Sequence, residues 1–211
     1  ISEIPEASKH YPVVFHSSEQ PMPIAIVGLG SDFNLFVNDA GEWERNVYIP
    51  GYLRRYPFAL ASETGGERMA LVFDTAYEGV SKTASRKLFE AGQLSEFSKQ
   101  AMEFARTYEG ERRSTDQAIE VLKKFNLVQP QSAQYNPVGT PDSITFAQYF
   151  GIEEKRLHEL SDAQFLELRK TNLLPIVYSQ LMSMANWRNL ISRRMQRFGM
   201  TESEALAPQA S

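Results

Sequence analysis

Hydrophobic positions between residues 10 and 75 fall in short runs, and turn-forming residues separate these runs at close intervals. β-Branched and aromatic side chains dominate the runs, as they do in strands, while glycine, proline, asparagine and serine fill the breaks. The pattern predicts a meander of antiparallel strands. The expected strands cover residues 13–15, 24–29, 35–37, 48–49, 56–60 and 69–73.

After Asp74 the hydrophobic residues recur every three or four positions, which is the period of an amphipathic helix. A second helix is expected to begin at Ser114, because Ser114 and Gln117 have the spacing of a capping box. Prolines and a glycine between residues 129 and 142 predict a loop, and a short strand is expected at 144–146. The helix expected before Ser114 has an apolar face that consists of Phe97, Ala101, Phe104 and Tyr108.

The C-terminal part begins with a second capping-box spacing, between Ser161 and Gln164, which predicts a short helix ending near Asn172. A long helix is expected next, with Pro175 in its first turn. Residues 201–211 are expected to form a disordered tail. The hydrophobic residues of the long helix follow a heptad rhythm through Leu174, Val177, Leu181, Met184, Ile191, Met195 and Phe198.

Three arginines lie in the last turns of this expected helix. Arg193, Arg194 and Arg197 are placed where cations complement the helix dipole.

These elements favour the α+β class. We expect an antiparallel β-rich N-terminal half, over about residues 10–75, packed against a mainly helical C-terminal half over 85–198. A chain of 211 residues fits one domain, which we expect to cover residues 1–200.

Charge and composition exclude several classes of function. Lys and Arg number 22 against 26 Asp and Glu, and the resulting net charge of −4 argues against a nucleic-acid partner. The absence of cysteine removes disulfides, thiolate metal sites and cysteine nucleophiles. No apolar run approaches the roughly 18 residues of a membrane span. We therefore expect a protein that does not span a membrane, and we place it in the cytoplasm.

The stretch "IAIVGLG" at 24–30 looks at first like the start of a dinucleotide-binding site. Such a site needs a third small residue and a helix, but position 33 is Phe33 and the run at 34–37 is strand-like. A P-loop is excluded as well, because no Gly-Lys-Ser/Thr follows. The stretch instead predicts a β-hairpin that turns between Gly28 and Asn34.

Catalytic and metal-binding patterns are weak. His10, His16 and His158 are the three histidines, and a two-histidine iron or zinc site would need two of them beside a carboxylate. The Gly-x-Ser-x-Gly elbow of hydrolases is missing. Asp74 follows a strand, where it is either a catalytic carboxylate or a cap for the next turn. We expect no metal and no cofactor, and we assign no catalytic residue.

The stretch "YIPGYLRRYPFAL" at 48–60 is the densest polar and aromatic cluster of the chain. Adjacent arginines on an extended segment point to opposite faces, so one of them could bind a carboxylate or phosphate with two hydrogen bonds. The alternative is that one arginine pairs with an acidic neighbour inside the fold. The candidate ligand-binding residues are Tyr52, Arg54, Arg55, Tyr56 and Asp74.

Several stretches together resemble the SapC family of bacterial proteins. In the first part they are "HYPVVF" (10–15), "PMPIAIVGL" (21–29), "NLFV" (34–37), "YIPGYLRRYPFAL" (48–60) and "LVFDTAY" (71–77). The resemblance continues in "LFEAGQLSEF", "RLHELSDAQFLELRK" and "LLPIVYSQLMSMANW", so it covers about residues 8–192. Members usually carry a further segment before the "HYP" block, which implies that this chain is cut at its start.

The resemblance implies a bacterial protein with a link to a surface layer, to outer-membrane uptake or to peptide modification. Its members have no assigned activity, so no catalytic residues can be carried over. We expect a non-enzymatic accessory or binding protein with a protein or peptide partner; a small-molecule ligand is the alternative occupant. The alternative function is a metal-independent enzyme that acts on a peptide or sugar through arginine and carboxylate groups, Asp74 with Arg54 or Arg55. The oligomeric state is not indicated.

Overall fold

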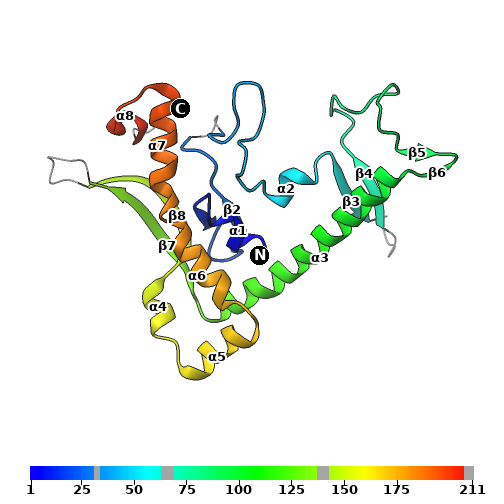
Figure 1. The fold of residues 1–211 in the computed structure, drawn as a ribbon. Coiled ribbons are helices and arrows are strands. Elements are labelled where there is room, and N and C mark those ends of the chain that lie inside the picture. The colour runs from blue at the N-terminus through cyan, green and yellow to red at the C-terminus, as the bar shows by residue number, and fades with distance from the viewer. Residues whose placement is uncertain (31–33, 63–68, 137–142, 207–211) are drawn as a thin grey trace. The chain divides into compact units, whose positions relative to one another are not determined.

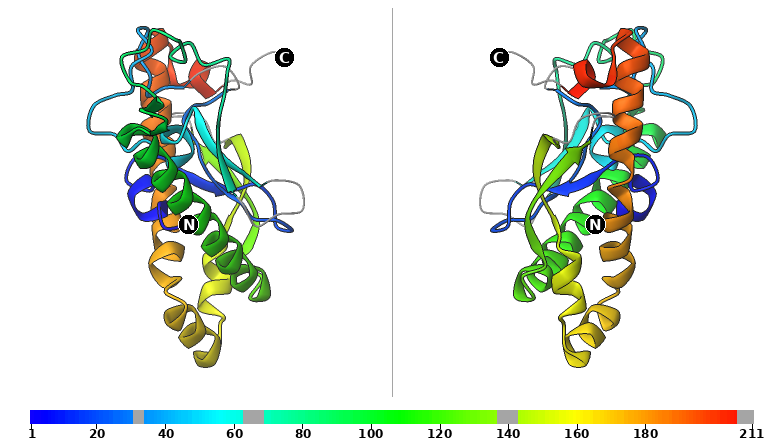
Figure 2. Two further views of the ribbon diagram at one scale, coloured as in Figure 1. Left: turned by 90° about the vertical axis from the view of Figure 1, so that its right-hand side faces the viewer. Right: turned by 90° about the vertical axis from the view of Figure 1, so that its left-hand side faces the viewer.

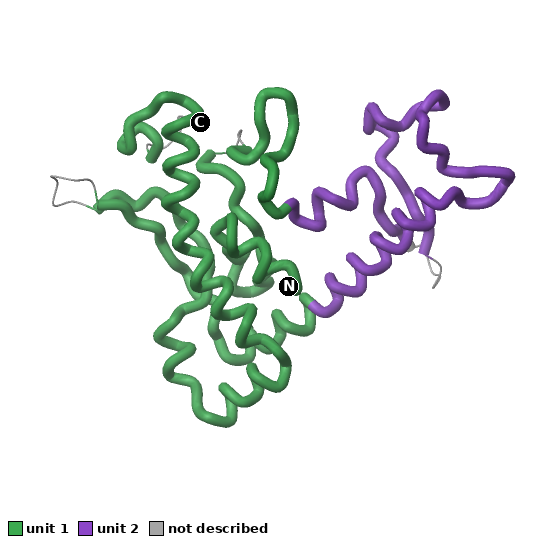
Figure 3. Tube along the Cα trace, viewed as in Figure 1, with its two compact units in different colours: residues 1–48, 115–211 green, residues 49–114 purple. Residues whose placement is uncertain are grey.

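The computed structural model describes residues 1–30, 34–62, 69–136 and 143–206 (Figure 1). The chain divides into two compact units (Figure 3). Unit 1 consists of Ile1–Tyr48 and Thr115–Ser211, and unit 2 consists of Ile49–Ser114. Each unit is described separately below.

Unit 1 is built on a four-stranded antiparallel sheet in the order β2-β1-β8-β7. The strand β1 (Val13–Phe15) is fully buried and pairs with β2 (Pro23–Ala25) on one side. Its other side meets β8 (Ile144–Ile152) at a single register pair, Phe15 opposite Phe150. β8 in turn forms a long hairpin with β7 (Val128–Tyr135), which has an irregularity between Ala133 and Gln134.

Helices of unit 1 pack on this sheet. α6 (Leu174–Ser183) and α7 (Asn186–Phe198) follow one another along it, and α6 contacts both β1 and β8 (Figures 1 and 2). Unit 1 also contains α1 (Ile4–Ala7), α4 (Glu154–His158), α5 (Asp162–Lys170), α8 (Glu202–Leu206) and the last part of α3 (Glu96–Lys124). The core that these elements enclose includes the fully buried side chains of Tyr11, Leu122, Leu127, Leu168 and Leu190.

Polar side chains of α6 complete the hydrogen bonding between β1 and β8. The Gln180 amide donates to the carbonyl of Val13 (2.9 Å) and accepts from the N–H of Ile152 (3.2 Å). The Ser183 hydroxyl accepts from the N–H of Val13 (3.0 Å) and donates to the carbonyl of Gln180 (2.6 Å). All four residues are buried, so these bonds satisfy backbone groups that neither water nor the short strand pairing reaches.

Unit 2 contains two hairpins, a short helix and part of a long one. β3 (Phe58–Ser62) pairs with β4 (Met69–Phe73), and β5 (Phe89–Glu90) pairs with β6 (Gln93–Leu94). The turn between β5 and β6 has positive φ at Ala91 (48°) and Gly92 (76°), as a two-residue hairpin loop requires. The helices are α2 (Gly51–Arg54) and α3 (Glu96–Lys124), which belongs to unit 2 up to residue 114 and to unit 1 beyond it.

The α+β class is confirmed, and the expected strands at 13–15 and 69–73 have the bounds that the pattern predicted. The single meander is wrong, because β1 and β2 join β7 and β8 while β3 and β4 form a separate hairpin. No strand forms at 48–49, and the run at 35–37 contributes an isolated bridge between Val37 and Trp43. β2 covers less than the expected 24–29, since it ends at Ala25.

The loop expected over 129–142 is wrong for its first part, which forms β7. Pro130 is tolerated there because β7 is the edge strand of the sheet, where a missing N–H costs no ladder hydrogen bond on the open side. Residues 137–142 lie outside the described part.

The helix start expected at Ser114 is wrong as well. α3 runs through this position, and the Ser114 hydroxyl donates to the carbonyl of Gly110 one turn earlier (3.2 Å). The capping box at Ser161 and Gln164 is confirmed, with both reciprocal hydrogen bonds present. The same residue pattern was thus overridden where a helix already passed through it.

The long C-terminal helix is interrupted at residues 184–185, which separate α6 from α7. Its buried face also differs from the expected heptad positions: Phe198 is exposed. The expected tail contains α8, whose first turn is capped by Thr201 and Glu204 through reciprocal hydrogen bonds. Residues 207–211 lie outside the described part. The buried face of α6 and α7 consists of Ile176, Val177, Gln180, Ser183, Asn186, Trp187, Leu190, Ile191 and Arg194.

The stretch from Ile24 to Val37 reverses direction, because the N–H of Leu35 donates to the carbonyl of Val27 (2.9 Å). Gly30 has a φ of 135°, a conformation that side chains disfavour. Residues 31–33, including Phe33, lie outside the described part. In residues 34–37, which follow the turn, no helix begins, so the geometry of a dinucleotide site is not formed there.

Candidate functional site

A pocket of about 550 Å³ lies within unit 2. Its wall is formed by the end of α2 and the start of β3, by β4 and the chain that follows it, and by the first half of α3. Arg54, Arg55 and Tyr56 all line it, so the structure brings three of the five candidate residues to one hollow. Of the other two, Tyr52 stacks on Arg55, and Asp74 is hydrogen-bonded to Tyr56.

The two arginines lie at the end of a helical turn rather than on an extended segment, which corrects the expected geometry. Pro50 precedes the turn with an extended backbone, and the N–H of Arg55 donates to the carbonyl of Gly51 (3.0 Å) to close it. Both side chains therefore follow helical spacing and contribute to the same pocket.

Arg55 is held between two tyrosine rings. Its guanidinium carbon is 4.8 Å from the ring centre of Tyr52 and 4.8 Å from that of Tyr108 on α3. Cations at this distance are attracted to the negative face of an aromatic ring. Stacking fixes the plane of the guanidinium while its N–H groups stay available at the edge.

Two further arginines repeat the arrangement around the pocket. Arg54 lies over Phe104 at 5.2 Å, and its Nε donates to the carbonyl of Ile49 (2.9 Å). Arg86 lies over Phe97 at 5.4 Å. Among the described residues that line the pocket there is no aspartate or glutamate, so the pocket is a concentration of positive charge in an acidic chain.

Tyr56 and Asp74 form a pair at the edge of the pocket. The Tyr56 hydroxyl donates to Oδ2 of Asp74 (3.0 Å), and Oδ1 of Asp74 accepts from the N–H of Ala76 (2.9 Å). The hydrogen bond to the Asp74 carboxylate raises the pKa of Tyr56 above its ordinary value of 10.0. Both carboxylate oxygens are thus used to order the turn after β4, which fits the capping interpretation of Asp74.

The arrangement can bind but shows little of what catalysis needs. Asp74 is hydrogen-bonded to Tyr56 and Ala76, whereas Arg54 and Arg55 lie over aromatic rings, so the enzyme alternative stays a prediction. The chemistry on offer is a set of guanidinium donors beside aromatic rings, which complements an anionic group attached to an apolar or aromatic body.

Across the described residues no group of three His, Asp or Glu side chains is placed to hold a metal ion. Within that same part of the chain, every helix is too short or too polar to cross a membrane. His10, His16 and His158 do not gather at the pocket.

The sequence of the chain matches one known family model over most of its length. The family model named SapC matches residues 1–190 of the chain. The chain belongs to the SapC family. The match covers nine-tenths of the chain and includes all of unit 2, and the resemblance read from the sequence is thereby confirmed. Searches of curated proteins and of solved structures found no match.

The wall of the pocket that α3 forms was not predicted from the sequence of this SapC-family chain. Phe97, Phe104 and Tyr108 had been recognised as one apolar helix face, and the structure shows that this face carries the rings on which the arginines lie. Arg54 and Arg55 lie about 50 positions from their aromatic partners on α3, so no local pattern in the sequence predicts that they meet. No local pattern marks Arg86 as a pocket residue.

Proposed function

We propose that this SapC-family protein is a non-enzymatic binding protein, and that the pocket of unit 2 holds an acidic, aromatic-containing segment of a partner protein. The observation that carries the proposal is a set of three arginines around one pocket. Arg54, Arg55 and Arg86 all line the pocket, and each lies over an aromatic side chain.

The positive charge supports an anionic ligand. Arg55 has no ion pair with a described residue, and its guanidinium lies 4.8 Å from the ring centres of both Tyr52 and Tyr108. A guanidinium stacked on an aromatic ring keeps the N–H groups at its edge available to other partners. An incoming carboxylate can accept two parallel hydrogen bonds from such an edge. The attraction for anions is local to this pocket. The net negative charge of the whole chain opposes nonspecific binding of anions elsewhere on the protein.

The surroundings of the pocket support a protein partner rather than a small molecule. Tyr52 and Tyr56 are 63% and 52% exposed, and Phe73, Tyr77 and Phe89 of the same unit are exposed as well. Tyrosine, phenylalanine and arginine are the residues that dominate the energetics of protein interfaces. A small ligand would leave most of this aromatic surface in water.

Family membership gives a second line of support. The SapC resemblance supports an accessory role in a bacterial surface-layer, outer-membrane uptake or peptide-modification system. A structural role for Asp74 agrees with its two local hydrogen bonds, which order the chain after β4.

The proposal is tested with a fluorescein-labelled peptide in which glutamate and phenylalanine alternate. The control peptide replaces each glutamate by glutamine. Fluorescence anisotropy is expected to show binding of the acidic peptide and at least about tenfold weaker binding of the neutral one, because charge-assisted hydrogen bonds are lost.

Two variants locate the site. Arg55→Gln is expected to weaken the acidic peptide at least about tenfold. Arg106→Gln is the matched control, because Arg106 is exposed on the face of α3 opposite to Phe97 and Phe104. Equal binding of the two peptides, or equal effects of the two variants, would contradict the proposal. Circular dichroism establishes that each variant is folded.

A further inference from the structure

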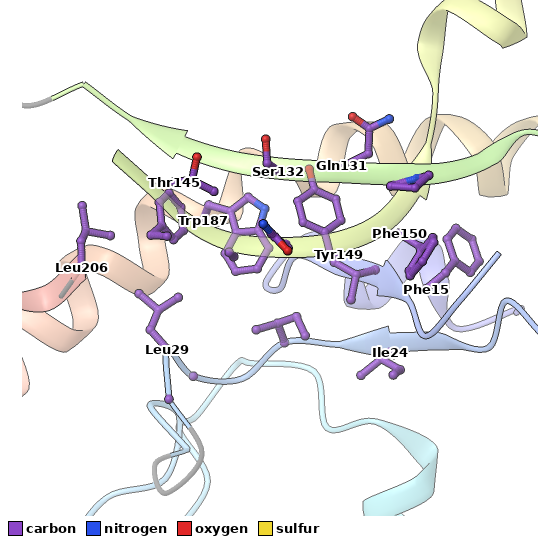
Figure 4. Close-up of a pocket in the computed structure, with 18 of the residues that line it drawn as sticks. Phe15, Ile24, Leu29, Gln131, Ser132, Thr145, Tyr149, Phe150, Trp187 and Leu206 are labelled. Carbon is purple, nitrogen blue, oxygen red and sulfur yellow. The ribbon is translucent and has the colours of Figure 1, made fainter. Parts of the chain in front are cut away.

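A second and larger cavity lies entirely within unit 1. Its volume is about 1290 Å³, and it shares no lining residue with the pocket of unit 2. β7 and β8 form one side and the segment through Leu29 forms the other; Trp187 of α7 lies beside the two strands, and Leu206 of α8 lies at one end (Figure 4). This cavity is independent of the proposed partner site.

Trp187 places an unsatisfied donor at this cavity. The side chain is 8% exposed, and its indole nitrogen has no hydrogen-bond partner among the described residues. The ring is held edge-on to Phe146 (centres 5.7 Å apart, 82°) and tilted against Tyr149 (5.7 Å, 45°). Buried N–H groups without an acceptor are rare in folded proteins, and the Trp43 indole nitrogen is a second one among the described residues.

Arg194 places a buried charge at the same cavity. It lies near the end of α7, and its side chain is only 6% exposed. One guanidinium nitrogen donates to the carbonyl of Ala205 in α8 (2.5 Å). In the described part of the chain no carboxylate pairs with it. A guanidinium has five N–H donors, and a buried one is stabilised by an anion.

The two groups lie on one face of α7. Trp187 and Arg194 are seven residues apart, which is two helical turns, or about 10 Å along the axis. Phe146, edge-on to Trp187, supplies apolar surface beside them, and Phe150 lines the same cavity next to Phe15. Burial raises the pKa of the Tyr149 phenol above 10.0; the Trp187 N–H is close enough to oppose part of this rise but does not reach hydrogen-bond geometry. Tyr149 therefore remains a neutral hydroxyl donor.

We infer that this cavity binds an organic acid with an apolar body, whose carboxylate pairs with Arg194 and whose body lies against Trp187, Phe146 and Phe150. The inference concerns a ligand site in unit 1 and does not depend on the peptide site proposed for unit 2.

Isothermal titration calorimetry with two matched pairs of probes tests it. Decanoate is compared with 1-decanol, and N-acetylphenylalanine with its amide. Binding of at least one acid, with its neutral counterpart at least about tenfold weaker, is expected from the loss of the charge-assisted pair. The pair that responds distinguishes a lipid-like acid from an amino-acid derivative. If neither acid binds, or if each acid and its neutral counterpart bind equally, the inference is overturned.

Variants then locate the bound acid. Arg194→Gln keeps a donor for the Ala205 carbonyl but removes the charge, and is expected to weaken the acid at least about tenfold. Arg188→Gln, on an exposed part of the same helix, and Arg55→Gln, in the other unit, are expected to leave it unchanged. Equal affinities for the Arg194 and Arg188 variants would overturn the assignment, and loss of binding in Arg55→Gln would place the acid in unit 2.

A second readout does not require Arg194 to be replaced. The chain has two tryptophans, so Trp43→Phe leaves Trp187 as its one fluorophore of this kind. Saturation with the acid is expected to shift the Trp187 emission, whereas the neutral counterpart at the same concentration leaves it unchanged. An emission that does not respond to a bound acid would show that the acid lies elsewhere.

Discussion

Replacement of Gln180 by methionine is expected to destabilise unit 1 strongly. Methionine has a similar length and apolar character, so the substitution removes hydrogen bonds with little change of volume. Two buried backbone groups lose their partner, the carbonyl of Val13 and the N–H of Ile152. Each unsatisfied buried group costs about 1–3 kcal/mol, so the free energy of unfolding is expected to fall by about 2–6 kcal/mol.

The assay is equilibrium unfolding in urea followed by tryptophan fluorescence. Both tryptophans, Trp43 and Trp187, belong to unit 1, so their emission reports on that unit. Gln196→Met is the matched control, because Gln196 is exposed on α7, and its effect is expected to stay within about 0.5 kcal/mol. A loss below about 1 kcal/mol for Gln180→Met, or one equal to that of the control, would refute the role assigned to Gln180.

A third variant separates hydrogen bonding from packing. Gln180→Glu keeps an acceptor for Ile152 but, when ionised, directs a buried negative charge at the carbonyl of Val13. Burial raises the pKa of such a carboxyl, so the unfolded chain releases its proton first. Stability of this variant is therefore expected to rise as pH falls through the raised pKa, toward that of the parent. A pH-independent deficit would show that packing, not hydrogen bonding, is lost.

Four smaller effects are also expected. Ser161→Ala removes the capping box of α5 and is expected to lower the free energy of unfolding by about 1 kcal/mol in the same urea assay, while Ser203→Ala serves as an exposed control. Gly151→Ala would place its Cβ 3.1 Å from Tyr149 and 3.3 Å from the Gln180 amide, so a loss of about 1–3 kcal/mol is expected; no measurable loss would show that these neighbours move aside freely. The hydrogen bond from Arg193 lowers the pKa of Glu44 below 4.5, so this pair stabilises the fold above that pH and loses its effect as pH falls through the lowered pKa; Glu44→Gln should make the acid limb of the stability profile shallower, and an unchanged limb would contradict this. Asp74→Asn should return the raised pKa of Tyr56 toward 10.0, measured by NMR titration with Tyr56→Phe to assign the signal, and a pKa that stays raised would rule out the carboxylate as its cause.

Local signals in the sequence located several elements correctly. The continuous apolar run at 69–73, the capping box at Ser161 and the proline in the first turn of α6 each depend on neighbours within a few residues, and all three are present in the structure. The capping box of α8, at Thr201 and Glu204, carried the same kind of signal and could have been recognised.

Features that depend on distant partners could not be predicted in this way. Pro130 argued against a strand, and only the edge position of β7 makes a strand acceptable there. Arg194 has the sequence context of a cation that complements a helix C-terminus, but in the structure it is buried and donates to the Ala205 carbonyl in α8. Gln180 interrupts an apolar helix face because its amide serves two strands, a role that no local pattern encodes.

The candidate site was predicted in part. The sequence located the arginine and tyrosine cluster around Arg54 and Arg55, and the structure adds the aromatic wall from α3 and corrects the backbone conformation from extended to helical. The binding role of these residues stays a prediction.

The central claim is that the arginines of the unit 2 pocket bind a carboxylate. The most direct measurement is an NMR titration of the arginine Nε–Hε signals with the peptide of alternating glutamate and phenylalanine, assigned through single Arg→Gln variants. Our account predicts saturable shifts of Arg54, Arg55 and Arg86, with Arg106 and Arg188 unchanged. Shifts of similar size at all exposed arginines, or no shift at Arg55 when the peptide is bound, would contradict it.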